Sequence, residues 1–364
     1  VDRDKRVEVR LPFGVGRGIT TTITTRAAGG EIDYDSQLSG VMAFVYEAKS
    51  DNPEENELLA YHLFSNPSNK PLEGATGGWI ADNDDPTCGE IKFYVPVGDV
   101  YIYLLGNAQS SFLNFFPGVS GGDALGTQAE FFEKATPKWN GNIHSVDGYL
   151  PLTGMVNNNT GLCHVNEQGQ ISYTDEEGKT HTLLPDGKHD EDNSCVLKRL
   201  MSKITMNIRE GKGVKFTARD YTVRHIPHYV SPTAQAWTEE ERDRILVEDA
   251  KPVNFGLLDS LTFTIYLPEN IRKVRSGVEI TEYRQRDKVA KTADNKNTEE
   301  TAPDDFHADN ADNHKGHYKF EFAPKASTYI ELTGWFENAD KTVAADVRYY
   351  IHLGNFGKDL NHFS

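Results

Sequence analysis

The chain has 364 residues, more than one domain of about 100–200 residues, and its length predicts two domains. The 55 acidic residues outnumber the 38 Lys and Arg, and the formal net charge of -17 argues against a nucleic-acid or anionic-membrane partner. No run of apolar residues approaches the roughly 18 that a membrane-spanning helix needs, so no membrane span is expected. With 18 Phe and 16 Tyr against four Met, the composition favours strands. We therefore expect a mostly β protein.

The N-terminal half begins with a clear period-2 pattern. Val7, Val9, Leu11 and Phe13 alternate with polar residues or Pro12, which predicts a half-buried strand. A Thr-rich extended segment follows at 19–25 and ends in the small, flexible residues 26–30. Further strands are predicted at 38–46, 57–64, 91–97, 100–105 and 148–156, a helix at 123–135, and a hairpin projecting from the body at 171–175 and 179–184.

The charged run at 189–193 predicts a domain boundary, and we divide the chain into domains 1–195 and 196–364. Thr238-Glu-Glu-Glu241 matches a capping box and predicts a short helix over 238–248. Residues 285–316 contain too few apolar side chains to pack and are predicted to form an exposed loop. The strands expected in this half lie at 204–208, 215–223, 260–267, 278–284, 318–322, 328–336 and 343–353.

The residue types that carry chemistry do not form a catalytic pattern. Gly14, Gly16 and Gly18 precede a Thr-rich strand, whereas a phosphate loop needs a helix at that point. No nucleophile motif occurs, so we expect no catalytic residue, no cofactor, no metal site and no enzymatic activity. Solvated polar side chains are favoured over metal ligands for the acidic and His clusters: Asp82, Asp84, Asp85, His307, Asp309, Asp312, His314 and His317. Cys88, Cys163 and Cys195 are expected to be free thiols, and Trp79, Trp139, Trp237 and Trp335 to be core or rim residues.

Several segments, in order along nearly the whole chain, resemble the fimbrillin family of Bacteroidales, which comprises type V pilus subunits and their accessory and tip proteins. Thr24-Thr-Arg-Ala27 ahead of the predicted strand at 38–46 resembles the family's cleavage segment and first core strand. The other matching segments are Tyr101–Ala108 (YIYLLGNA), Leu150–Gly154 (LPLTG), Leu197–Ile204 (LKRLMSKI), Tyr266–Asn270 (YLPEN) and Tyr350–Gly354 with Asn361–Phe363.

The resemblance implies two consecutive antiparallel β-sandwich domains of transthyretin-like type with short helices. It also implies an outer-membrane lipoprotein precursor that is displayed at the cell surface in a fimbrium. The implied partners are other fimbrial subunits, bound by donor-strand exchange, and a ligand on a host or bacterial surface. The family's sequences continue past the position of Ser364, so the resemblance leaves two alternatives: a fragment with an incomplete second domain, or a subunit with an unusual end. No lipidation Cys stands near Val1, so the resemblance implies that the lipoprotein part is removed or omitted.

In the family, a trypsin-like protease cuts after an arginine in the segment that follows the first strands. The resemblance therefore implies cleavage between Arg26 and Ala27, where small residues allow the extended form that a protease binds. A tip adhesin that contacts its ligand through the insertions at 157–194 and 285–316 is an alternative. A rival from another class is a secreted carbohydrate-binding or carbohydrate-active β-sandwich, which as an enzyme would need two carboxylates roughly 5–10 Å apart in an aromatic-lined cleft.

Overall fold

The computed structural model describes residues 1–16, 37–69, 71–82, 87–108, 113–115, 125–134, 136–141, 143, 149–158, 160–185, 193–233, 247–257, 262–269 and 328–353. Strands make up 58 % and helices 5 % of the structure, which confirms a mostly β protein. The predicted strands at 19–25, 278–284 and 318–322, the loop at 285–316 and most of the predicted helix at 238–248 lie outside the described residues.

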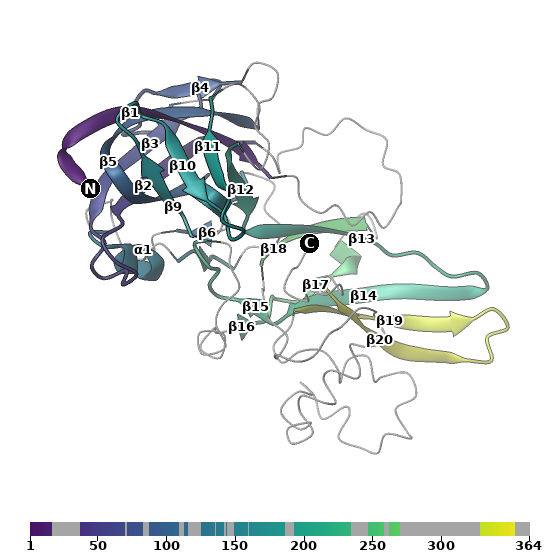
Figure 1. Ribbon diagram of the computed structural model, residues 1–364. Coiled ribbons are helices and arrows are strands. Elements are labelled where there is room, and N and C mark those ends of the chain that lie inside the picture. Colours follow the sequence, from purple (N-terminus) through teal and green to yellow (C-terminus); the bar gives the residue numbers. More distant parts are fainter. Residues whose placement is uncertain are drawn as a thin grey trace. The chain divides into compact units, whose positions relative to one another are not determined.

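The chain divides into two compact units, which are described separately (Figure 1). The first comprises Val1–Met201 with Val230–Gln235, and the second comprises Ser202–Tyr229 with Ala236–Ser364. The division into domains 1–195 and 196–364 stays a prediction. Strand β12 (Cys195–Arg199), just past that division, is hydrogen-bonded to strands of the first unit.

Ten strands of the first unit form one continuous sheet, with the 19-residue strand β5 as its hub. The N-terminal part of β5 pairs with β1 and β4, and its C-terminal part pairs with β2, β8 and β9. The remaining pairs are β2–β3, β9–β10, β10–β11, β8–β12 and β1–β12. Besides β12, the strands are β1 (Asp2–Val15), β2 (Gly40–Glu47), β3 (Leu58–Ser65), β4 (Trp79–Ala81), β5 (Cys88–Gly106), β8 (Leu152–Met155), β9 (Leu162–Val165), β10 (Ile171–Thr174) and β11 (Thr180–Leu183).

The prediction of separate strands at 91–97 and 100–105, on either side of Gly98, is wrong, because one strand, β5, covers both ranges. The pairing partner changes there without a gap, because Asp2 of β1 pairs with Val97 and Val165, the last residue of β9, pairs with Gly98. The predicted hairpin at 171–184 is confirmed as β10–β11, but it extends the sheet through β9 and does not project from the body. Its apolar residues Ile171 and Leu183 are buried in the core.

Four strands of this sheet close on themselves. β1 pairs with β12, β12 with β8, β8 with β5, and β5 with β1, so the four form a small barrel. β1 and β12 run parallel, whereas the other three pairs are antiparallel. Alternation along the strands predicted at 38–46 and 100–105 places Val41, Ala43, Val45, Tyr101, Tyr103 and Leu105 inward. Val41, Ala43 and Val45 are fully buried in the surrounding core. On β5 this core contains Ile102 and Leu104 instead, while Tyr103 and Leu105 are buried on the opposite face of the sheet and Tyr101 is half-buried.

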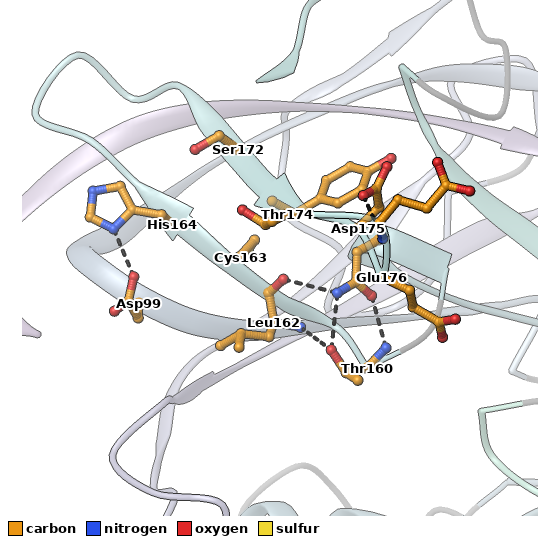
Figure 2. Close-up of a pocket in the computed structure, with 12 residues that line it drawn as sticks. Asp99, Thr160, Leu162, Cys163, His164, Ser172, Thr174, Asp175 and Glu176 are labelled. Carbon is orange, nitrogen blue, oxygen red and sulfur yellow. Dashed lines mark hydrogen bonds and ion pairs between the residues drawn. The ribbon is translucent and has the colours of Figure 1, made fainter. Parts of the chain in front are cut away.

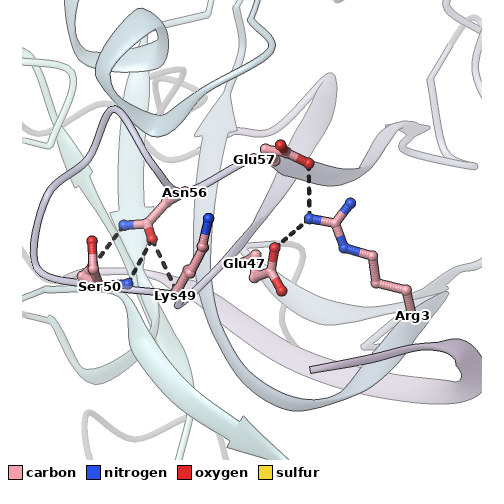
Figure 3. Close-up of polar contacts among 6 residues, drawn as sticks. All are labelled: Arg3, Glu47, Lys49, Ser50, Asn56 and Glu57. Carbon is pink, nitrogen blue, oxygen red and sulfur yellow. Dashed lines mark hydrogen bonds and ion pairs between the residues drawn. The ribbon is translucent and has the colours of Figure 1, made fainter.

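Short elements complete the first unit: helix α1 (Gln128–Lys134), strands β6 (Leu113–Asn114) and β7 (Lys138–Trp139), and a 3-10 turn at Val156–Asn158. The helix predicted at 123–135 is thus confirmed over a shorter range. Fully buried Asn56 closes the loop between β2 and β3, because its Oδ1 accepts the Lys49 and Ser50 amides at 2.9 and 3.1 Å (Figure 3). Its amide donates to Gln128 at 2.7 Å, which ties this loop to α1.

The second unit has a four-stranded sheet in the order β17-β14-β19-β20, with Tyr221 of β14 stacked on Phe263 of β18 at 4.1 Å. Ile204, Met206 and Ile208, whose alternation predicts that they face inward, are half-buried and alternate with the exposed residues Lys203, Thr205 and Asn207. In the described part of the chain, β13 pairs with β18 in a two-stranded sheet, which gives its side chains little to pack against. The strands are β13 (Met201–Asn207), β14 (Val214–Arg224), β15 (Ile226–Pro227), β16 (Val247–Glu248), β17 (Val253–Asn254), β18 (Thr262–Pro268), β19 (Tyr329–Asn338) and β20 (Ala344–His352), with a 3-10 turn at Phe255–Leu257.

The end of the helix predicted at 238–248 is wrong. Val247 and Glu248 form β16 and pair with Pro227 and Ile226. Their backbone groups bond across to another strand, which outweighs the local capping signal.

Candidate functional site

The first unit holds its N-terminal strand in a slot. β1 pairs with β5 from Arg6 to Gly14 along one edge and with β12 from Phe13 to Val15 along the other. Beside Glu8, the turn between β9 and β10 lies so close that a Cβ on Gly169 would stand 2.1 Å from the Glu8 carbonyl oxygen. We call the space between β5, β12 and the turn 166–169 the β1 slot.

The inward face of β1 is part of the hydrophobic core. Val9, Leu11 and Phe13 are fully buried, as the period-2 pattern predicts, and Val7 packs against the same cluster. The Phe13 ring meets the Trp79 indole edge-on, with centroids 4.9 Å apart. β1 therefore supplies core side chains to the unit through non-covalent contacts.

The outward face of β1 is held by charge. Arg3 bridges Glu47 and Glu57, with its guanidinium 2.8 Å from the Glu57 carboxylate, and these hydrogen bonds raise the pKa of Arg3 (Figure 3). Lys5 lies 2.6 Å from Glu167.

Closer to the centre of β1, Arg10 Nη2 lies 2.5 Å from Glu90 Oε2. Arg6 donates to the Leu59 carbonyl oxygen at 3.1 Å, and Glu8 lies 3.8 Å from Lys92. The cations of β1 thus meet acceptors on β2, β3, β5 and the two loops beside them.

The predicted processing residues Arg26 and Ala27 lie outside the described residues, so the structure gives them no geometry. What it describes is the strand that precedes them, whose end is fixed where Arg199 Nη1 donates to the Gly16 carbonyl at 2.8 Å. The carboxylates that form ion pairs with the Arg and Lys side chains of β1 were not predicted from the sequence. The basic residues of VDRDKRVEVR were the available signal, but their partners lie far along the chain.

A second feature of this unit is a polar groove of about 750 Å³ beside β9 and β10 (Figure 2). It falls within the predicted insertion at 157–194, apart from Asp99, whose carboxylate lies 2.7 Å from His164 Nδ1. Asp175 lies 2.7 Å from His181, and this hydrogen bond lowers the pKa of Asp175. The lining residues are Asp99, Asn157, Thr160, Leu162, Cys163, His164, Ser172, Tyr173, Thr174, Asp175, Glu176 and Glu177.

The polar groove can accept hydrogen bonds from hydroxyl or ammonium groups, because eight of its twelve lining residues carry a carboxylate or a hydroxyl. It does not provide a sugar-stacking platform: Tyr173 is buried and stacks on His181 with centroids 5.0 Å apart. Burial raises the pKa of Cys163, which keeps this thiol protonated and unreactive. Within the described ranges, no three His, Cys, Asp or Glu side chains are grouped to hold a metal ion.

Comparisons with known proteins give weak structural likenesses, among them the two below. No family model matches the chain, and no curated protein does. A "putative cell adhesion protein" from Parabacteroides distasonis is 11 % identical with a TM-score of 0.47, covering 95 % of this chain and 80 % of its own. Another from Bacteroides fragilis is 9 % identical with a TM-score of 0.27, covering 98 % and 90 %. Likenesses this weak assign neither a family nor a function to this chain. In the part of the chain that the structure describes, no helix is long and apolar enough to cross a membrane.

Proposed function

We propose that this chain is a non-catalytic structural or adhesive subunit of a cell-surface fimbrium, made as an outer-membrane lipoprotein precursor and assembled by strand exchange. One observation carries the proposal: β1 is an N-terminal strand that fills a slot with β5 on one edge and β12 on the other. Its core side chains Val9, Leu11 and Phe13 can be replaced by those of another strand with the same alternation.

A cut between Arg26 and Ala27 would turn β1 into a separately bound segment. The rest of the sheet does not depend on β1 for its continuity, since β12 also pairs with β8 and β5 with β2, β4, β8 and β9. The slot would then expose the edges of β5 and β12 and accept an extended segment of the next subunit.

The proposal is tested by limited trypsin digestion, followed by exchange with a labelled peptide of residues 1–16. We expect the first cut at Arg26, a fragment that stays bound, and its slow replacement by the peptide. Trp79 emission reports the event because Phe13 touches that indole. First cutting elsewhere, loss of the β circular dichroism on nicking, or a fragment that never exchanges in excess peptide would reject strand exchange.

The polar groove supports a second role, contact with a hydroxyl-rich or cationic surface ligand. Four carboxylates line it, most of it lies in the predicted insertion, and it is separate from the residues that hold β1. Binding to glycan-coated or cell surfaces by the unaltered chain should be reduced by E176Q/E177Q and unchanged by E210Q, an exposed substitution in the second unit. Equal binding by all three chains would exclude the groove.

A further inference from the structure

The β1 slot contains a carboxylate that needs a cation from the strand it holds. Glu90 is 7 % exposed, and its Oε2 makes no hydrogen bond of ordinary geometry with the described residues. The same oxygen lies 2.5 Å from Arg10 Nη2, so the positive charge of β1 compensates this carboxylate. Because an uncompensated buried charge is strongly unfavourable, a neutral strand that covers Glu90 would leave it in an unstable state, whereas in an empty slot water can solvate it.

Glu90 is one of several acidic groups spread along the slot. Toward the start of β1, Glu47 and Glu57 receive Arg3, and Glu167 at the turn between β9 and β10 receives Lys5. These outer pairs are at least partly exposed, with 50 % of the Arg3 side chain and 45 % of the Lys5 side chain accessible. Arg10 is similarly exposed at 41 %, but the side chain of its partner Glu90 is 10 % exposed against 59 % for Glu57 and 64 % for Glu167. The pairs of Glu57 and Glu167 therefore contribute less than the Arg10 pair, because water and salt screen exposed carboxylates.

Around Arg10, charged and core side chains alternate along β1. Arg10 lies between Val9 and Leu11, so a strand shifted by one residue would turn its cation into the core and an apolar residue toward Glu90. The stability of the buried Glu90 carboxylate therefore depends on both the charge of the bound strand and its register.

We infer that the β1 slot selects its donor strand by charge; this inference rests on the proposed strand exchange. The occupant is an extended segment of another subunit with a cation at the position of Arg10, flanked by inward apolar residues, and further cations at the positions of Arg3 and Lys5. Neutral or acidic segments are rejected by Glu90, Glu47, Glu57 and Glu167.

Peptides of residues 1–16 test the inference on the full chain nicked after Arg26, and because the protein itself is unaltered, a folding defect cannot explain the result. Because Arg10 is 41 % exposed while Glu90 is buried, Arg10→Gln should weaken peptide affinity by roughly 10-fold, and Arg10→Lys by less. Glu8→Gln is the matched control: Glu8 is 47 % exposed and its partner Lys92 is 3.8 Å away, so a change of at most about 3-fold is expected. Equal affinity of the Arg10→Gln peptide and the unaltered peptide would overturn charge selection while leaving strand exchange intact.

A double-mutant cycle in the intact chain gives a readout that does not require exchange. Unfolding by urea is compared for the unaltered chain, R10Q, E90Q and R10Q/E90Q. We expect R10Q to reduce the folding equilibrium constant at least about 10-fold more than it does when E90Q is already present. Additive effects would overturn the inference. Coupling in this cycle combined with failure of the unaltered peptide to exchange would instead reject the proposed function and retain the Arg10–Glu90 requirement of the slot.

Discussion

Truncating Leu11 to Ala tests whether β1 belongs to the cooperative core of the first unit. Leu11 is fully buried, and its strand is held by β5 along its length and by β12 near its end, so the surroundings can collapse little around the missing atoms. The lost burial and the remaining cavity should lower the free energy of unfolding by about 2–5 kcal/mol, toward the upper part of that range.

The assay is urea unfolding of the full chain, with hydrogen exchange of β5 peptides assigning the transition to the first unit. With a slope of about 1–3 kcal/mol per molar urea, the midpoint should fall by roughly 1 M or more. Glu8→Ala is the control on the same strand, and its exposed pair with Lys92 should contribute less than about 1 kcal/mol. A loss below about 1 kcal/mol for Leu11→Ala would mean that β1 is not part of the cooperative core.

The same substitution links stability to exchange. In the nicked protein, a peptide with Leu11→Ala should bind roughly 30- to 4,000-fold more weakly, because the same cavity is now formed in a bound complex. Peptide competition against the unaltered sequence measures this ratio. A ratio near one would show that the peptide does not occupy the position of β1.

Three further predictions concern other parts of the first unit. Gly169→Ala should destabilise it by more than about 2 kcal/mol, since φ is +76° and the new Cβ would meet backbone at 2.1 Å, whereas Gly178→Ala, in open space at φ +81°, should cost about 1 kcal/mol by urea unfolding. Burial, followed by the charge of Arg6, lowers the pKa of His62, so the unfolded chain takes up the proton at a higher pH than the folded chain. The free energy of unfolding should therefore fall as the pH drops through about 6.5. His62→Leu should reduce this pH dependence in melts recorded at several pH values. Cys163 and Cys195, whose pKa values are raised by burial, should react with a thiol reagent only after unfolding, and rapid labelling of the native chain would contradict that burial.

The sequence by itself determined the local elements of this protein. Strands alternate their side chains across two faces, so the spacing of Val9, Leu11 and Phe13 identifies the inward face of β1 without knowledge of its neighbours. The same holds for Val41 and Val45 of β2. These patterns are readable because each depends on residues only two positions apart.

The tertiary structure decided which strands meet and which charges pair. β1 finds β12 more than 180 residues further along the chain, and no local pattern encodes that parallel partner. Pro96 and Gly98 predict a break, yet β5 continues because β1 and β9 satisfy its backbone in succession. The Arg10–Glu90 pair could not be predicted from the sequence for the same reason. The chain has 55 acidic residues, and only the register of β1 against β5 brings Glu90 beside Arg10. Long-range backbone pairing, which sequence spacing does not specify, thus sets both the β1 slot and its charge.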